Sequence, residues 1–137
     1  VTYVGMGPHE SYSDKHRASW HGRFTTDVEA LATNYIRPQE NGSHYDCTLL
    51  QIGDACTTLS VIGADPFCFN ASRTTQEELA TCRHDVDLRP RDETVLCIDH
   101  AQAGIGSNSC GPSLIERYRV DDDEYHLDFT FIPITNY

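Results

Sequence analysis

The feature that most constrains this chain is a strict alternation of apolar and polar residues near its end. Large apolar side chains occupy every second position of one run: Tyr125, Leu127, Phe129 and Phe131. Successive side chains of a β-strand point to opposite faces, so this pattern is typical of a strand with one buried face. A similar alternation runs over residues 114–120, and the acidic stretch 121–124 between the two runs predicts a hairpin turn.

Shorter apolar segments, each bounded by Gly, Asp or Pro, predict further strands. They are rich in β-branched, Leu, Cys or Phe residues, which favour the pleated surface of a sheet. The predicted segments are 1–4, 46–52, 57–63, 67–72 and 94–99. Short strands joined by short turns indicate an all-β, antiparallel fold.

Helices are expected to be few and short. Thr75 and Glu78 have the spacing of a capping box, in which each side chain accepts the other residue's backbone N–H, so a helix is predicted to begin there. A second, shorter helix is predicted over residues 28–32.

Residues 5–26 and 100–113 mix Gly, Ser and polar residues without a period, and both are predicted to be long irregular loops.

The overall composition excludes several classes of partner. A formal net charge of −11 argues against nucleic acid, whose binding depends on clustered Lys and Arg. No apolar run approaches the roughly 20 residues that span a bilayer, so we expect no membrane partner. We find no internal repeat or linker, and 137 residues therefore read as one domain or one part of a domain.

Six cysteines leave two alternatives open. Their spacing is long and irregular, without a CxxC pair: Cys47, Cys56, Cys68, Cys82, Cys97 and Cys110. Thiols within apolar or helical segments behave as small hydrophobes, which favours reduced cysteines and a cytoplasmic protein. The rival is a secreted interaction domain held by disulfides, for which the even count is the argument.

Catalytic and metal-binding motifs are weak. The seven histidines lack ligand spacings such as HxxxH, so we expect no metal site. Cys110 has no obvious base nearby in the sequence and is interpreted as a non-catalytic thiol. The loop carboxylates Glu10, Asp14 and Glu40 could serve as an acid–base pair in sugar hydrolysis. The alternative is that they accept backbone N–H groups and so hold their loops.

Four loop motifs, taken together in their order and spacing, are more specific than any one of them. They are GMGPHESYSDK at 5–15, YIRPQENG at 35–42, FNASRTTQEEL at 69–79 and DHAQAGIGSNSCGPS at 99–113. Together these motifs resemble the small-chain domain of the β-galactosidases of glycoside hydrolase family 2, along nearly the whole chain.

The resemblance implies a fold and a division of labour. Residues 1–137 would form the carboxy-terminal portion of a large antiparallel β-supersandwich related to galactose mutarotases. The parent would be a cytoplasmic, retaining bacterial β-galactosidase acting on terminal non-reducing β-D-galactosides such as lactose. The family's two catalytic glutamates lie on a separate barrel domain, so no residue here, Glu10 and Glu40 included, is expected to be catalytic. Magnesium and sodium or potassium, used by the family, are not expected to bind within this portion.

The resemblance also places two candidate substrate-binding residues in the Gly-Ile-Gly loop. The best-known member of the family has a tryptophan in this loop that stacks on the sugar. By alignment of GIGSNSCGPS that position falls on Cys110, in a loop one residue shorter. A thiol cannot supply a flat stacking surface, so we expect contacts to the sugar from Asn108 as well as Cys110, or from another domain. For the loops around Glu10 and Glu40 we predict structural anchoring.

The partners implied are the other domains of the parent enzyme and a galactoside substrate. Since part of the domain would be missing, we also expect an unpaired strand edge or apolar face that drives self-association. The alternative reading is a freestanding carbohydrate-binding or mutarotase-like module, for which Trp20 is the candidate aromatic platform.

Overall fold

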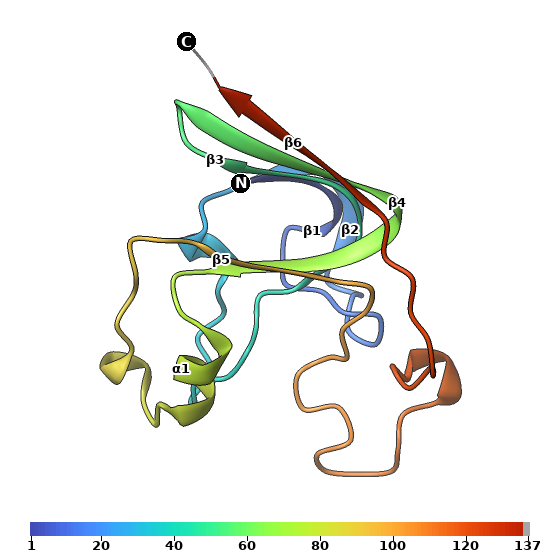
Figure 1. The fold of residues 1–137 in the computed structure, drawn as a ribbon. Coiled ribbons are helices and arrows are strands. Elements are labelled where there is room, and N and C mark those ends of the chain that lie inside the picture. The colour runs from blue at the N-terminus through green and yellow to red at the C-terminus, as the bar shows by residue number, and fades with distance from the viewer. Residues whose placement is uncertain (136–137) are drawn as a thin grey trace.

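The fold is an antiparallel β-sheet, shown in Figure 1 as a computed structural model that describes residues 1–135. Six strands occupy this part of the chain: β1 Thr2–Gly7, β2 Trp20–Thr25, β3 His44–Gly53, β4 Thr57–Ser72, β5 Val95–Asp99 and β6 Phe129–Thr135. Every pairing between named strands is antiparallel. The predicted all-β, antiparallel class is therefore confirmed. Asn136 and Tyr137, the end of the predicted domain, lie outside the described residues.

The strand order is β2-β1-β3-β4-β5, and β6 also pairs with β4. Strand β4 is 16 residues long, and its two ends have different neighbours. Residues 57–63 pair with β6, whereas residues 68–72 pair with β5. The two strands predicted at 57–63 and 67–72 are thus one continuous strand, which runs through Pro66.

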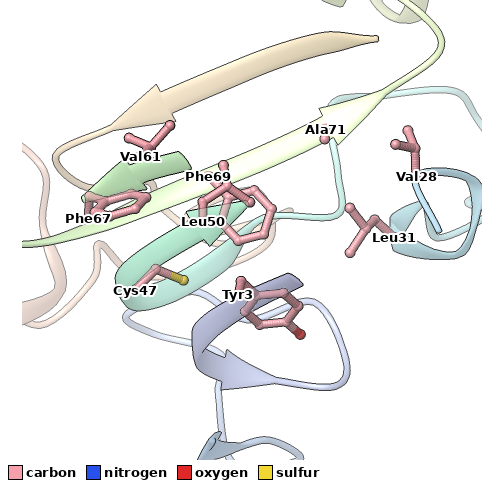
Figure 2. Close-up of a cluster of buried hydrophobic side chains, with 9 residues drawn as sticks. All are labelled: Tyr3, Val28, Leu31, Cys47, Leu50, Val61, Phe67, Phe69 and Ala71. Carbon is pink, nitrogen blue, oxygen red and sulfur yellow. The ribbon is translucent and has the colours of Figure 1, made fainter. Parts of the chain in front are cut away.

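The hydrophobic core lies on one face of this sheet. Three side chains at alternate positions of β4 enter it, namely Phe67, Phe69 and Ala71. Tyr3 from β1 and Leu50 from β3 meet them there, and both are fully buried (Figure 2). Burying one Leu or Phe side chain stabilises a fold by roughly 1.5–3 kcal/mol, so these few residues supply much of the driving force.

Three short 3-10 helices and one α-helix complete the described elements. They are η1 Glu29–Leu31, α1 Gln76–Thr81, η2 Asp85–Asp87 and η3 Glu116–Tyr118. The predicted capping box of α1 is confirmed, because Thr75 Oγ1 accepts the Glu78 N–H at 3.2 Å and Glu78 Oε2 accepts the Thr75 N–H at 2.9 Å. The second predicted helix forms only the single 3-10 turn η1, whose Leu31 reaches the core.

The predicted terminal hairpin is wrong. Residues 114–120 form no strand, and η3 occupies their middle with Ile115 66% exposed. Strand β6 begins only at Phe129 and pairs with β4 instead, with Phe131 opposite Val61. Alternation indicated which residues could share a face, but it does not identify the strand that pairs with them.

The predicted loop over residues 5–26 is also wrong at both of its ends. Strand β1 continues to Gly7, and β2 returns beside it with Thr2 opposite Thr25. Only residues 8–19 between these strands are irregular. Strand β2 escaped notice because it is an edge strand with mainly polar, exposed side chains, which lack the signal of a buried face.

Candidate functional site: a loop layer held by two carboxylates

The candidate site is built from three segments that contact one another through loop carboxylates. We call residues 8–16, 33–42 and 100–113 the loop layer. The first segment follows β1 and the third follows β5, and Figure 1 shows the third lying below the sheet together with α1. The backbone N–H and C=O groups of such irregular segments need hydrogen-bond partners, because no neighbouring strand or helix supplies them.

Residues 8–16 are partly packed into the protein. Ser11 and Tyr12 are both fully buried, whereas Pro8, His9 and Lys15 are exposed. The Ser11 N–H donates to the carbonyl of Ser43 at 2.7 Å, and its hydroxyl donates to the Met6 carbonyl at 3.1 Å. The same hydroxyl oxygen accepts the Tyr45 N–H at 3.0 Å. One serine therefore ties this loop to β1 and to the start of β3.

Glu10 is the first of the two carboxylates that hold the layer, and its side chain is only 6% exposed. It accepts hydrogen bonds from Lys15 Nζ at 2.5 Å, the Gly42 N–H at 3.1 Å and the Tyr12 hydroxyl at 3.2 Å. The Tyr35 hydroxyl donates to it as well. A single side chain thus joins residues 8–16 to residues 33–42.

These donors keep Glu10 ionised. Burial on its own would raise the pKa of this carboxyl, but the hydrogen bonds from Lys15, Tyr35 and Gly42 together hold the pKa below its usual value. Both carboxylate oxygens are already bonded to protein donors. Glu10 is therefore a structural acceptor and is not free to act as an acid or nucleophile.

Asp14 is the second carboxylate, and it holds the Gly-Ile-Gly loop. Its Oδ1 accepts the Gly104 N–H at 2.9 Å, and its Oδ2 accepts the Ser107 hydroxyl. A Cβ atom at Gly104 would lie 2.4 Å from this carboxylate, so a side chain there would push the two loops apart. The chain turns tightly at Gly104–Gly106, with the Ser107 N–H donating to the Gly104 carbonyl at 3.2 Å.

Asn108 and Cys110 both lie on the segment that Asp14 holds. Asn108 has a positive φ of 65°, and its Oδ1 accepts the Leu114 N–H at 2.7 Å, which closes the loop on itself. Cys110 is exposed two residues later. The structure therefore places both predicted substrate-binding residues on one loop beside residues 8–16. Their binding of a sugar remains a prediction.

The segment around Glu40 is anchored in a different way from Glu10. Asn41 accepts the Thr33 N–H at 2.8 Å and donates to the Gln39 carbonyl at 2.8 Å. Glu40 receives the side-chain amide of the buried Asn70 at 3.1 Å. The predicted anchoring through backbone groups is thus confirmed for Glu10 and Asp14, while Glu40 contacts a side chain.

The cysteines and the possible metal-ligating side chains were the subject of two predictions from the sequence. All six cysteines are free; Cys47 and Cys68 are buried, and burial raises the pKa of the Cys68 thiol to about 11. Such thiols stay protonated and pack as small hydrophobes. Within residues 1–135, no three His, Cys, Asp or Glu side chains are grouped so that they could hold a metal ion.

Trp20, the candidate platform of the alternative reading, lies at the start of the edge strand β2. It is 60% exposed and contacts Phe24 edge to face, with ring centroids 5.7 Å apart.

No helix among residues 1–135 is long and apolar enough to cross a membrane.

The fold and the loop layer define a class: an all-β domain whose loops are held by two carboxylates bonded to protein donors. The family model described as "Beta galactosidase small chain" matches residues 1–131. This chain belongs to the β-galactosidase small-chain family.

Curated relatives agree with this assignment. A β-galactosidase of Actinobacillus pleuropneumoniae is 45% identical over 132 residues, and one of Staphylococcus xylosus is 43% identical over 131 residues. A β-galactosidase of Alteromonas mediterranea is 36% identical over 132 residues. Each match covers 96% of this chain but only 12–13% of the relative. The chain thus spans about an eighth of the length of these relatives.

Proposed function

We propose that this chain is a non-catalytic, carboxy-terminal portion of a β-galactosidase. The parent would hydrolyse terminal non-reducing β-D-galactosides such as lactose, and this portion would shape the sugar site and contact neighbouring domains. The observation that carries the proposal is the match over 96% of this chain to only 13% of a relative named β-galactosidase. Such a share leaves most of the parent polypeptide to supply the catalytic carboxylates.

The chain's own contribution would be the loop that Asp14 holds. Fixing Gly104 and Ser107 places Asn108 and Cys110 at a defined position relative to residues 8–16. Neither residue offers a flat surface, so the contacts we propose are hydrogen bonds from the Asn108 amide and shape complementarity at Cys110. These contacts would orient a sugar that other domains hydrolyse.

Kinetics of the parent enzyme test this role. Asn108→Ala and Cys110→Ala are expected to raise KM roughly three- to tenfold with little change in kcat, because they remove binding shared by the ground state and transition state. Asp123→Ala, in the exposed turn that precedes β6, is the matched control and should leave KM unchanged. If both loop variants match the wild-type KM, this loop does not contact the substrate.

The division of labour has its own test. The purified 137-residue chain is expected to be inactive on a chromogenic galactoside under conditions where the parent turns it over. Cleavage at enzymatic rates by this chain, abolished by Glu10→Gln or Glu40→Gln, would contradict the proposal directly.

The parent's magnesium and its sodium or potassium, which the family resemblance implies, would be held elsewhere. Within residues 1–135 no three His, Cys, Asp or Glu side chains are grouped so that they could hold such an ion, and the contributions that we propose for this chain involve no metal. A cytoplasmic location is part of the same proposal, and its support is that all six thiols are free. A thiol count on protein purified under denaturing, alkylating conditions tests the location.

One observation favours a second candidate function, a freestanding carbohydrate-binding or mutarotase-like module. Trp20 is exposed, as the stacking platform of such a module would be. Galactose titration of the 137-residue chain separates the two: millimolar binding that is lost in Trp20→Ala would favour the module. The β-galactosidase proposal expects no such binding by this chain.

Contacts with the rest of the parent are proposed at β6. Phe131, Ile132 and Ile134 are each exposed on this strand, which is more apolar surface than a lone edge strand usually shows. In the parent, another segment would cover them; in the isolated 137-residue chain they would drive self-association. Light scattering over a concentration series checks this, and a strictly monomeric chain would count against it.

A further inference from the structure

A cavity of about 500 Å³ lies outside the loop that Asp14 holds. It opens between the segment that follows η1 and the stretch from β4 through α1 to residue 92. Apolar side chains form much of its wall, among them Ala71, Leu79 and Leu88, with Pro38 and Pro90. Its size falls within the range of sites that hold a small molecule or an inserted side chain.

The charged and amide groups around the cavity are largely bonded to one another. Arg73 Nε donates to Glu29 at 3.0 Å, and Arg73 Nη1 donates to the Asp92 carbonyl at 2.6 Å. Arg91 donates to Glu78 at 2.9 Å. Asn41 uses its amide for the backbone of its own segment. A sugar needs several convergent polar groups that are free to bind it, so this lining suits an apolar occupant better.

Two exposed aliphatic residues are next in sequence to residues that line the cavity. Ile36 is fully exposed, and its neighbour Tyr35 lines the cavity. Val86 is 79% exposed, and its neighbour Asp85 also lines the cavity. An apolar hollow whose lining segments also carry uncovered aliphatic residues has the composition of the centre of a protein–protein interface.

We propose that this cavity and the exposed Ile36 and Val86 on its lining segments, which we call the Ile36–Val86 surface, bind an apolar segment of the parent polypeptide that lies outside these 137 residues. The inference deepens the proposed function and rests on its premise of a longer parent. The family's relatives support that premise, because this chain covers only 13% of their length. A segment tethered in the same polypeptide is present at high effective concentration, which favours it over a second copy.

Site-specific photo-crosslinking in the full-length parent tests this inference. A benzophenone amino acid is placed at Ile36, at Val86 and, as the matched control, at Ile115, which is 66% exposed and whose segment contributes no residue to the cavity lining. Crosslinked peptides are identified by mass spectrometry after mixing unlabelled and heavy-isotope-labelled protein, so that links within one polypeptide and links between copies are told apart. The readout needs no activity.

The expected result is a crosslink from both Ile36 and Val86 to one apolar peptide of the same polypeptide beyond residues 1–137. The probe at Ile115 should not form this product. Crosslinks to a second copy would overturn the proposal in favour of self-association. Crosslinks confined to residues 1–137, or none, would overturn it in favour of a free surface. If the crosslink forms but the parent lacks galactosidase activity, the proposed function fails while this inference stands.

A substitution gives an independent measurement in the same protein. Ile36→Asp places a charge at the proposed interface and is expected to lower the thermal midpoint of the parent, whereas Ile115→Asp is expected to leave it unchanged. The fully exposed position of Ile36 in this chain means that the substitution itself removes no core contact. Equal midpoints for the two variants would overturn the proposal.

Discussion

The sheet and the loop layer are ordered by different means. In the sheet, Tyr3, Leu50 and Phe69 are fully buried, and order comes from apolar surface that many residues share. In the loop layer, order comes from two carboxylates, Glu10 and Asp14, each bonded to donors from distant parts of the chain. Apolar packing is distributed and non-directional, whereas a hydrogen-bonded carboxylate fixes particular atoms at particular positions.

This difference separates stability from placement. Core substitutions are expected to cost the most free energy, because cavities in a close-packed interior do not refill. Loop-layer substitutions are expected to cost less but to move the residues proposed to contact the sugar. The following predictions test that separation, beginning with the largest expected change in the free energy of unfolding.

Phe69→Ala should have the largest effect. Its ring is fully buried and contacts those of Tyr3 and His44, with centroid distances of 5.3 and 5.2 Å. Removing a buried Phe side chain typically costs about 3–5 kcal/mol. Urea unfolding of the chain measures the loss. Phe131→Ala, at a ring 54% exposed, is the control and should cost less than about 1 kcal/mol. Equal losses would mean that the core is wrongly located.

His44 should make the core sensitive to pH. Its ring is 1% exposed, its Nδ1 lies 3.2 Å from the Met6 carbonyl oxygen, and its Nε2 has no hydrogen-bond partner among residues 1–135. Burial lowers the pKa of this imidazole from 6.5 to about 4. Between these values the unfolded chain binds a proton that the folded chain does not. The contribution of the neutral His44 to the free energy of unfolding is therefore fully present above pH 6.5. It is lost as the pH drops toward 4, and the whole loss is roughly 3 kcal/mol.

The measurement is the free energy of unfolding between pH 6.5 and about 5, which avoids the range where most carboxylates titrate. His44→Leu should abolish the slope in this window, while replacing the exposed His126 with Leu should leave it intact. A wild-type slope in the His44 variant would show that another group takes up the proton.

Glu10→Gln should cost less, about 2 kcal/mol, because it removes the charge that Lys15 and the two tyrosine hydroxyls share while leaving an oxygen for Gly42. Since the folded pKa of Glu10 lies below its usual value, its stabilisation is present above pH 4.5 and is lost as the pH falls below that value. Urea unfolding checks both statements. Glu124→Gln, at a carboxylate 80% exposed, should change neither the free energy nor its pH dependence.

The sequence predicted what depends on neighbours along the chain. The capping box of Thr75 and Glu78 is local, and it is present. Pairing between distant segments has no local signal: β6 pairs with β4 rather than with residues 114–120, and β2 carries no buried face to mark it. For the same reason the cavity beside Ile36 could not be predicted, because its walls come from segments far apart in sequence.

The contact between Asp14 and Gly104 is the clearest case, since 90 residues separate its partners. The family resemblance placed both motifs in order, yet only the fold brings them together. Asp14→Ala in the parent enzyme therefore tests most directly whether the loop layer governs placement and the sheet governs stability. It leaves the Gly104 N–H and the Ser107 hydroxyl without their acceptor at a part-buried contact, so we expect a stability loss of about 1 kcal/mol, the lower end for an unsatisfied donor.

The effect on function should be larger than that loss suggests. Without the carboxylate, residues 104–110 are no longer fixed to residues 8–16, and we expect KM to rise roughly fivefold with kcat nearly unchanged. Asp14→Asn keeps one acceptor oxygen and should recover part of the wild-type KM. A variant that loses stability and kcat together, without this partial recovery, would show that Asp14 supports the fold as the core does and does not position the Asn108 loop.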